Sequence, residues 1–336
     1  MNQTVKIETP KVKMNVIQAI NAALDDAMAA DENVFLLGED IGDREEGGVC
    51  LVTKGLSTKY GEARVRSTPI TEQAIIGAAI GAAIVGMRPV AEIMLMNFTT
   101  VAMDMIVNHA AKLRFMSGGQ THVPLVIRCM TGAGMGSGGQ HSDFLEGWFA
   151  HTAGLKVVMP SNPADAYGLM LSSIEDNDPV IFVEHLLTFW NPGEGPERGV
   201  KIPLGKARTV QEGSDVTVVS YSATVNHAAA AAATLAKEGV SVEVIDLRTI
   251  SPWDKEAVLA SVAKTGRAVI AHEALRNFGP GGEIASTISE ELFGRLKAPV
   301  RRVGAVTCPV PFSKPLETAF MPGEAAIIEA IRSTLS

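Results

Sequence analysis

The sequence is poor in cysteine, with three cysteines among its 336 residues. Cys50, Cys129 and Cys308 are odd in number and far apart, so they predict neither a disulfide framework nor a CxxC metal site. Such sparse cysteine usage is typical of proteins in a reducing compartment. We therefore expect a cytoplasmic protein.

Long apolar runs and basic clusters are absent too. The longest apolar run, Ala74 to Met87, is shorter than the ~20 residues that a membrane span requires, and its Gly and Ala content predicts a buried helix. The chain carries 29 Lys and Arg against 37 Asp and Glu, without a basic run that could follow a phosphate backbone. We expect neither a membrane nor a nucleic acid as a partner.

Three familiar catalytic motifs are also missing. The sequence contains no HExxH pattern, no Walker A pattern and no GxSxG pattern. Zinc-dependent hydrolysis, P-loop phosphoryl transfer and the serine hydrolase nucleophile therefore have no support.

Helical and strand-like apolar patterns alternate along the chain. Helical spacing is expected over 17–28, 74–85, 98–113 and 164–174, then in the Ala-rich segment to 237, around 258 and near 284–292 and 327–331. Apolar runs predict strands at 34–37, 89–93, 123–129, 155–159, 180–183, 216–221, 240–245 and 268–271. This alternation predicts an α/β fold with mainly parallel sheets flanked by helices.

A stretch rich in proline and glycine, Phe189 to Pro203, interrupts the alternation. Neither a helical nor a strand period can continue through it, so it predicts a linker. A chain of 336 residues is long enough to bury a core in each of two domains. We expect an N-terminal arm at 1–13, a first domain at 14–188, the linker at 189–203 and a second domain at 204–336.

The segment Gly134 to Gly139 fits the GxGxxG pattern and follows an apolar strand, which is typical of a dinucleotide-binding turn. That turn also needs an acidic residue at the end of the next strand, and Val157 to Pro160 supplies none. Alternatively, the glycines form a flexible loop that delivers His141. His141 can exchange protons near neutral pH or be structural, and an NAD-dependent oxidoreductase stays an alternative.

Glu72 directly precedes the predicted helix at 74–85, and two interpretations are open. A carboxylate in a first helical turn stabilises the helix by capping and by its interaction with the dipole. Small residues such as Gly77 and Gly81 would also let another backbone pack closely, which would bury Glu72 at an interface. A carboxyl group in an apolar setting made by Ile70, Met94 and Phe98 would be suited to acid-base work.

Six short motifs lie in order along the chain, namely GEDI at 38–41, TPITE at 68–72, VIR at 126–128, QHS at 140–142, GLKVV at 154–158 and DLRT at 246–249. Together they resemble the beta subunits of the thiamine-diphosphate-dependent decarboxylating component of 2-oxo acid and acetoin dehydrogenases, over nearly the whole sequence. The resemblance implies a transketolase-like pyrimidine-binding domain followed by a transketolase C-terminal domain.

The resemblance also implies roles for single residues. Glu72 matches the glutamate that hydrogen-bonds the aminopyrimidine ring of thiamine diphosphate and favours its imino form. Ile70, Met94 and Phe98 would then lie around this cofactor. His141 matches the histidine that donates a proton as the acyl group passes to the lipoyl arm of the acyltransferase core.

Members of this family often hold a potassium ion with backbone carbonyls and one side chain. The matching positions here are Leu125, Ser173, Ile174, Asp176 and Asp178. The resemblance therefore implies a potassium site between these residues.

One family feature is missing from the sequence. Thiamine enzymes of this family anchor the diphosphate through Mg²⁺ with a Gly-Asp-Gly motif and a downstream Asn pair, and Gly42-Asp43-Arg44 is no substitute. In two-chain members this motif lies on the alpha subunit. The resemblance thus implies an alpha partner that holds the Mg²⁺, in an alpha2-beta2 heterotetramer.

The substrate stays open between a 2-oxo acid and acetoin. Met94 stands where pyruvate-type chains often have Gln, which favours acetoin, whereas Leu186 and Trp190 depart from the usual Lys and Tyr pattern. A non-catalytic scaffold subunit is the remaining alternative.

Overall fold

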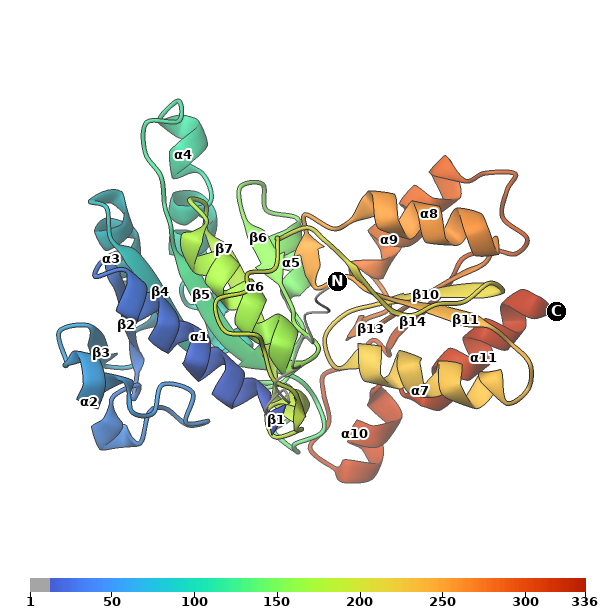
Figure 1. Ribbon diagram of the computed structural model, residues 1–336, viewed down its shortest axis with the longest axis horizontal. Coiled ribbons are helices and arrows are strands. Elements are labelled where there is room, and N and C mark those ends of the chain that lie inside the picture. Colours follow the sequence, from blue (N-terminus) through green and yellow to red (C-terminus); the bar gives the residue numbers. More distant parts are fainter. Residues whose placement is uncertain (1–12) are drawn as a thin grey trace, which may run out of the picture.

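The computed structural model describes residues 13–336, so the expected N-terminal arm lies outside the described residues except for Lys13. The chain forms two α/β halves, seen in Figure 1 with the N-terminal half in blue to green and the C-terminal half in yellow to red. Each half carries helices on both faces of a mainly parallel sheet. The expected fold class is confirmed.

The first half is built on a seven-stranded sheet with the order β12-β6-β7-β5-β4-β2-β3. Its neighbouring strands are parallel, except that β12 pairs antiparallel with β6. The strands are Val34–Glu39 (β2), Val65–Thr68 (β3), Arg88–Leu95 (β4), Val126–Thr131 (β5), Lys156–Val158 (β6), Val180–His185 (β7) and Thr249–Ser251 (β12). Since β12 comes from the C-terminal half, both halves of the chain contribute to this sheet.

The second half contains a five-stranded sheet with the order β14-β13-β10-β11-β9. Only β9 runs antiparallel to its neighbour, β11. The strands are Arg208–Gln211 (β9), Val216–Ser220 (β10), Val242–Asp246 (β11), Ala268–Leu275 (β13) and Arg301–Ala305 (β14). A separate two-residue pair joins Lys13–Met14 (β1) to Gly193–Glu194 (β8), which lies in the expected linker.

Helices cover both faces of each sheet. In the first half, α1 and α6 pack on one face, and α3 and α5 pack on the other. In the second half, α7 and α11 cover one face, with α8 and α9 on the opposite side (Figure 1). The α-helices are Val16–Ala30 (α1), Leu56–Tyr60 (α2), Glu72–Ile84 (α3), Leu113–Met116 (α4), Glu146–Ala150 (α5), Pro163–Glu175 (α6), Thr224–Ala236 (α7), Lys255–Thr265 (α8), Gly281–Glu291 (α9), Lys314–Phe320 (α10) and Glu324–Leu335 (α11).

Asparagine residues begin both α1 and α6. The side chain of Asn15 accepts a hydrogen bond from the backbone N–H of Gln18 at 2.9 Å, and the Gln18 side chain accepts one from the Asn15 N–H at 3.0 Å. Asn162 caps α6 through the N–H of Asp165 at 2.9 Å, with Pro163 in the first turn. These contacts satisfy N–H groups that lack partners within the helix.

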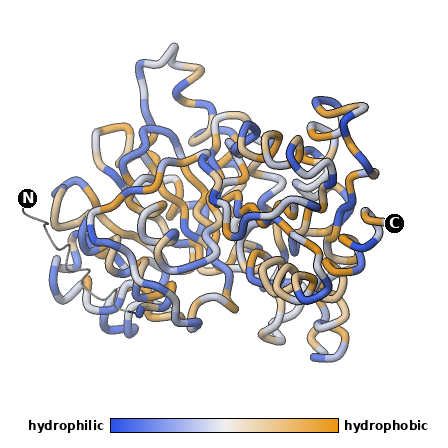
Figure 2. The backbone as a smooth tube through the Cα atoms, turned by 45° about the vertical axis from the view of Figure 1, so that its right-hand side comes forward, coloured by the Kyte–Doolittle hydropathy of each residue, from blue (hydrophilic) through white to orange (hydrophobic). Residues whose placement is uncertain are grey.

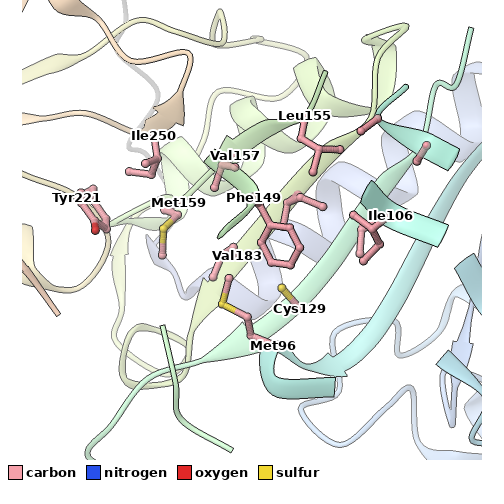
Figure 3. Packing of buried hydrophobic residues seen from close by; sticks show 14 of the residues in the cluster. Met96, Ile106, Cys129, Phe149, Leu155, Val157, Met159, Val183, Tyr221 and Ile250 are labelled. Carbon is pink, nitrogen blue, oxygen red and sulfur yellow. The ribbon is translucent and has the colours of Figure 1, made fainter. Parts of the chain in front are cut away.

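The hydrophobic core continues from one half into the other. Figure 3 shows Tyr221 and Ile250 of the C-terminal half close to Met159 and Val157 of the first sheet. Hydrophobic stretches of the backbone run through the interior in Figure 2. The packing therefore holds the two halves together as well as holding each sheet to its helices.

The segment expected as one long helix at 98–113 is broken in the structure. It contains a 3₁₀-helix at Met96–Thr100, a π-helix at Met105–Ala110 and the short α4. The hydroxyls of Thr99 and Thr100 donate to carbonyls three residues earlier, at 2.6 and 2.7 Å. Such local bonds compete with a regular helical ladder, which explains the interruption.

Candidate active site

The predicted site residues lie at the carboxyl ends of strands in the first sheet. The parallel strands β5, β4, β2 and β3 are neighbours in that order, and their carboxyl ends lead into the segments that carry His141, Phe98, Glu39 and Glu72. Ligands of open parallel sheets bind outside the carboxyl ends of the strands. The fold therefore gathers residues from four separate segments at an edge suited to binding.

Glu72 is the first residue of α3, and its side chain is half-buried. Thr71, directly before it, makes no side-chain cap to the helix. Ile70 is 71% exposed, so it does not enclose the carboxylate within this chain. The apolar setting expected around Glu72 is thus incomplete on the side of Ile70.

The outer face of α3 is apolar and open. Ala74, Ala78 and Gly81 are exposed, and Val85, just after the helix, is 79% exposed. A Cβ atom added at Gly81 would meet nothing within 4 Å. An exposed stripe of small apolar residues beside a half-buried carboxylate marks a surface where another chain can pack closely.

Acidic side chains gather near Glu72. Partial burial and the negative charges of Asp40, Glu72 and Glu92 raise the pKa of Glu39, which ends β2. Glu39 therefore lies within electrostatic reach of Glu72. Among the described residues, the charged groups that shift the pKa of Glu39 are all carboxylates, and none is an arginine or a lysine.

A buried ion network fixes the strands below this edge. Arg128 donates from Nε and Nη2 to the two carboxylate oxygens of Glu184 at 2.6 and 2.8 Å, and from Nη1 to Glu92 Oε2 at 2.5 Å. All three side chains are buried. The network joins β4, β5 and β7, because each residue comes from a different strand.

His141 lies beside Phe98. The two rings are edge-on, with centroids 5.5 Å apart and an interplanar angle of 76°. Asn97 holds the backbone around the histidine: its amide nitrogen donates to the Gly139 carbonyl at 3.1 Å and to Asp143 Oδ2 at 2.8 Å. The Asp143 N–H in turn donates to the Asn97 side-chain oxygen at 3.2 Å.

The glycine loop before His141 does not form an open dinucleotide turn. The N–H groups of Gly134 and Gly136 both donate to the carboxylate of Glu317, with the shortest distance 2.6 Å. A pyrophosphate would need such N–H groups free at a helix N-terminus. Here a side chain of the C-terminal half occupies them, so the structure argues against the NAD alternative.

Asp43 is committed to the backbone and not to a metal. Its carboxylate accepts from the N–H of Gly55 at 2.5 Å, and from the N–H and hydroxyl of Thr58 at 2.7 and 2.5 Å. Although burial opposes them, these hydrogen bonds lower the pKa of Asp43 to about 2. Within residues 13–336, no group of three or more His, Cys, Asp or Glu side chains is placed to hold a metal ion.

The carbonyl groups expected to hold potassium already have partners. Arg88 donates from Nη1 to the carbonyls of Ile174 and Asp176 at 3.0 and 3.2 Å. The Leu125 carbonyl accepts the N–H of Val180 at 2.9 Å within the sheet region. A guanidinium therefore contacts the carbonyls of Ile174 and Asp176.

The side chains expected at the same site are also paired. Lys156 Nζ donates to both oxygens of Asp176 at 2.7 and 2.5 Å, and Arg114 donates to Asp178 Oδ1 at 2.7 Å. The Ser173 hydroxyl donates to a carbonyl of its own helix. Protein cations thus contact Asp176 and Asp178, and a potassium site among these residues stays a prediction.

Sequence reasoning missed three residues that shape the site. Glu39 carried a signal, because it directly follows an apolar run and lies in one of the ordered motifs. Asn97 and Glu317 carried none, since each acts through a contact with a segment far away in the chain.

Comparison with known families agrees with the two halves described above. The model of the transketolase pyrimidine binding domain matches residues 12–187, and that of the transketolase C-terminal domain matches residues 205–327. The acetoin:2,6-dichlorophenolindophenol oxidoreductase subunit beta of Cupriavidus necator is 46% identical, covering 96% of this chain and 98% of its own. The pyruvate dehydrogenase E1 component subunit beta of Staphylococcus epidermidis is 44% identical, covering 96% and 99%. The chain belongs to this family of dehydrogenase beta subunits.

Solved structures show the same fold as this beta-subunit family member. A split gene transketolase, solved as an inactive beta4 tetramer, matches with a TM-score of 0.78 and 21% identity, covering 96% of this chain and 99% of that chain. Transketolase from Leishmania mexicana matches with a TM-score of 0.71 and 16% identity, covering 97% of this chain and 46% of that chain. No helix within residues 13–336 meets the length and apolarity needed to cross a membrane.

Proposed function

We propose that this chain is the beta subunit of a thiamine-diphosphate-dependent dehydrogenase that decarboxylates a 2-oxo acid or cleaves acetoin. It would pass the acyl group to a lipoyl acyltransferase core. The proposal rests on one observation above the others: Glu72 begins a helix at the carboxyl edge of the sheet and is only half-buried within this chain. Thiamine diphosphate supplies the carbon nucleophile and the electron sink of such reactions.

The residues present fit the pyrimidine end of that cofactor. Met94 lies at the carboxyl end of β4 and Phe98 just beyond it, and both side chains are half-buried. Ile70 precedes α3 and its side chain is exposed. A flat ring can lie against such apolar groups, and a carboxylate can hold the proton at a ring nitrogen. We assign this role to the carboxylate of Glu72.

The diphosphate end needs a second chain. The carboxylate of Asp43 already accepts hydrogen bonds from the N–H of Gly55 and from the N–H and hydroxyl of Thr58. It therefore does not replace the metal-binding aspartate of a Gly-Asp-Gly motif. We infer that an alpha subunit holds the Mg²⁺ and the diphosphate and covers the open face of α3, in an alpha2-beta2 heterotetramer. The exposed Ala78 and Gly81 support close packing of that subunit.

We assign acyl transfer to His141. Its half-buried ring stands edge-on to Phe98, which we place beside the cofactor. Imidazole exchanges protons near neutral pH, which suits a group that protonates the sulfur released when the lipoyl disulfide opens during transfer.

The test is reconstitution with the alpha subunit and added thiamine diphosphate and Mg²⁺. Glu72→Gln should lower turnover by about 10² or more with assembly intact, because acid-base catalysis contributes about 10²–10⁴. Glu256→Gln is the control, since Glu256 is an exposed glutamate in the first turn of another helix, α8. If Glu72 only stabilises its helix, the two variants should behave alike.

The same assay separates the alternatives and the substrates. If the chain is a non-catalytic scaffold subunit, the Glu72→Gln complex should stay fully active. If it is an NAD-dependent oxidoreductase, the isolated chain should bind NAD tightly. Comparing pyruvate, branched-chain 2-oxo acids and acetoin as substrates of the assembled pair would identify the reaction.

A further inference from the structure

The segment that follows His141 borders a cavity between the two halves of the chain. Ser142, Phe144 and Leu145 line an interdomain cavity of about 530 Å³, together with Phe278 and Pro309 of the C-terminal half. A segment beside a cavity has few neighbouring atoms to fix it. On its other side, His141 is preceded by the loop that begins after β5, and hydrogen bonds to that loop therefore contribute to the position of His141.

The backbone of this loop forms a pocket for an anion. Gly134 and Gly136 have φ values of +109° and +68°, which residues with a side chain rarely adopt. Alternation of such residues turns neighbouring N–H groups toward one point, where an anion can bind. In this chain the anion is a carboxylate of the protein itself.

That carboxylate belongs to Glu317, on α10 of the C-terminal half. Gly134 N donates to its Oε1 at 2.6 Å, and Gly136 N donates to its Oε1 and Oε2 at 3.1 and 3.2 Å. The Glu317 residue is 2% exposed. A buried carboxylate is costly unless it is hydrogen-bonded, so these charge-assisted bonds hold the loop firmly.

A second carboxylate of the same half holds the start of the loop. Glu273 Oε1 accepts the N–H of Ala133 at 2.7 Å, and its Oε2 lies 2.8 Å from His185 Nε2. Because His185 Nδ1 accepts the N–H of Leu187 at 3.1 Å, the proton is assigned to Nε2, which donates to Glu273. The C-terminal half thus contacts the loop at three N–H donors, those of Ala133, Gly134 and Gly136.

We propose that Glu317 is a positioning residue for His141: through Gly134 and Gly136 it sets the place of the histidine that performs acyl transfer. The proposal rests on the function assigned to His141 above. Glu317 itself touches the loop backbone and not the reacting groups. Its effect should therefore fall on acyl transfer and leave decarboxylation largely unchanged.

The experiment uses the assembled complex and two assays on each variant. One follows turnover with an artificial electron acceptor, which needs no lipoyl group, and the other follows acylation of a lipoyl domain. For Glu317→Gln we expect the lipoyl rate to fall about tenfold or more, since a displacement of about 1 Å can cost 10²-fold, with the artificial-acceptor rate within about twofold. Glu329→Gln, an exposed glutamate of the same half, is the control.

Two further measurements keep the proposal testable if stability falls. Hydrogen exchange at Gly134 and Gly136 should speed up in Glu317→Gln and stay unchanged in Glu329→Gln. In Glu317→Ala, added propionate should restore part of the lipoyl rate, while chloride at equal ionic strength should not, because only a carboxylate refills the anion pocket.

The outcomes separate this proposal from the function on which it rests. If the unmodified complex shows no thiamine-dependent turnover, the proposed function fails. If it turns over normally but Glu317→Gln lowers both rates equally, or lowers neither, the positioning role is overturned. Unchanged exchange at Gly134 and Gly136 would overturn it as well.

Discussion

The ring of His141 stands edge-on to the ring of Phe98, with 5.5 Å between the ring centroids. The two side chains come from segments that follow different strands, β5 and β4, so the contact exists only in the folded sheet. An aromatic pair of this kind contributes about 0.5–1.5 kcal/mol beyond its buried area. Phe98 therefore helps to orient the histidine at the site.

Replacing His141 should separate two functions of the assembled enzyme. For His141→Ala we expect acylation of a lipoyl domain to fall by about 10² or more, because a proton donor is lost, with little change in thiamine diphosphate affinity. Rates of lipoyl acylation and a cofactor titration would measure this. Equal impairment of both would show that the residue has a structural role instead.

Removing Arg128 should destabilise the chain strongly. Arg128→Met leaves the carboxylates of Glu92 and Glu184 buried without their cation, which costs about 3–5 kcal/mol. Arg332→Met is the control, since Arg332 forms an exposed pair with Glu238 that contributes about 0–1 kcal/mol. Urea unfolding of both variants gives the comparison, and similar losses would contradict the prediction.

The buried carboxyl of Glu146 should make stability depend on pH. Burial raises its pKa from 4.5 to about 7, although Tyr221 Oη donates to Oε1 at 2.6 Å. Between these two values the folded chain binds more protons than the unfolded chain, so stability falls as pH rises. At about 1.4 kcal/mol per pKa unit, the loss is on the order of 3 kcal/mol at pH 8.

Glu146→Gln removes this titration and keeps an acceptor for Tyr221. We expect the variant to gain stability relative to the unmodified protein between pH 5 and pH 8, as measured by unfolding at both values. A difference that does not change with pH would show that Glu146 carries no raised pKa.

Melting temperatures in different salts test the potassium site that the resemblance implies. Lys156 and Arg88 already supply positive charge to Asp176 and to the neighbouring carbonyls. If potassium binds there, the melting temperature of the assembled enzyme should be higher in potassium chloride than in sodium or choline chloride at one ionic strength. Equal melting temperatures in the three salts would show that these protein cations take the place of the ion.

Much of the fold could be predicted from local pattern. The apolar periods at 17–28 and 164–174 became α1 and α6, and the run at 180–183 became part of β7. The strand expected at 123–129 begins instead at Val126, because Pro124 cannot donate to a sheet. The edge strand β14 was missed, since Arg301 and Arg302 interrupt any apolar run.

Less of the site could be predicted, because its geometry comes from contacts between distant segments. Glu72 at a helix start has a sufficient structural explanation in its own neighbourhood, and only the ordered motifs pointed to catalysis. The contact between Glu317 and Gly134 joins residues 183 positions apart, and no local period records it. The potassium donors were expected from resemblance, yet their lysine and arginine partners depend on the folded arrangement.

The strand β12 has a consequence for how the chain can be divided. It supplies Thr249–Ser251 to the edge of the first sheet, beside β6. A fragment that ends in the segment near residue 200 would keep the pairing of β6 with β7 but leave its other side unpaired, and an open sheet edge favours association with other chains. The two family domains are thus consecutive in sequence but share one sheet, and we expect neither to be stable when it is expressed alone.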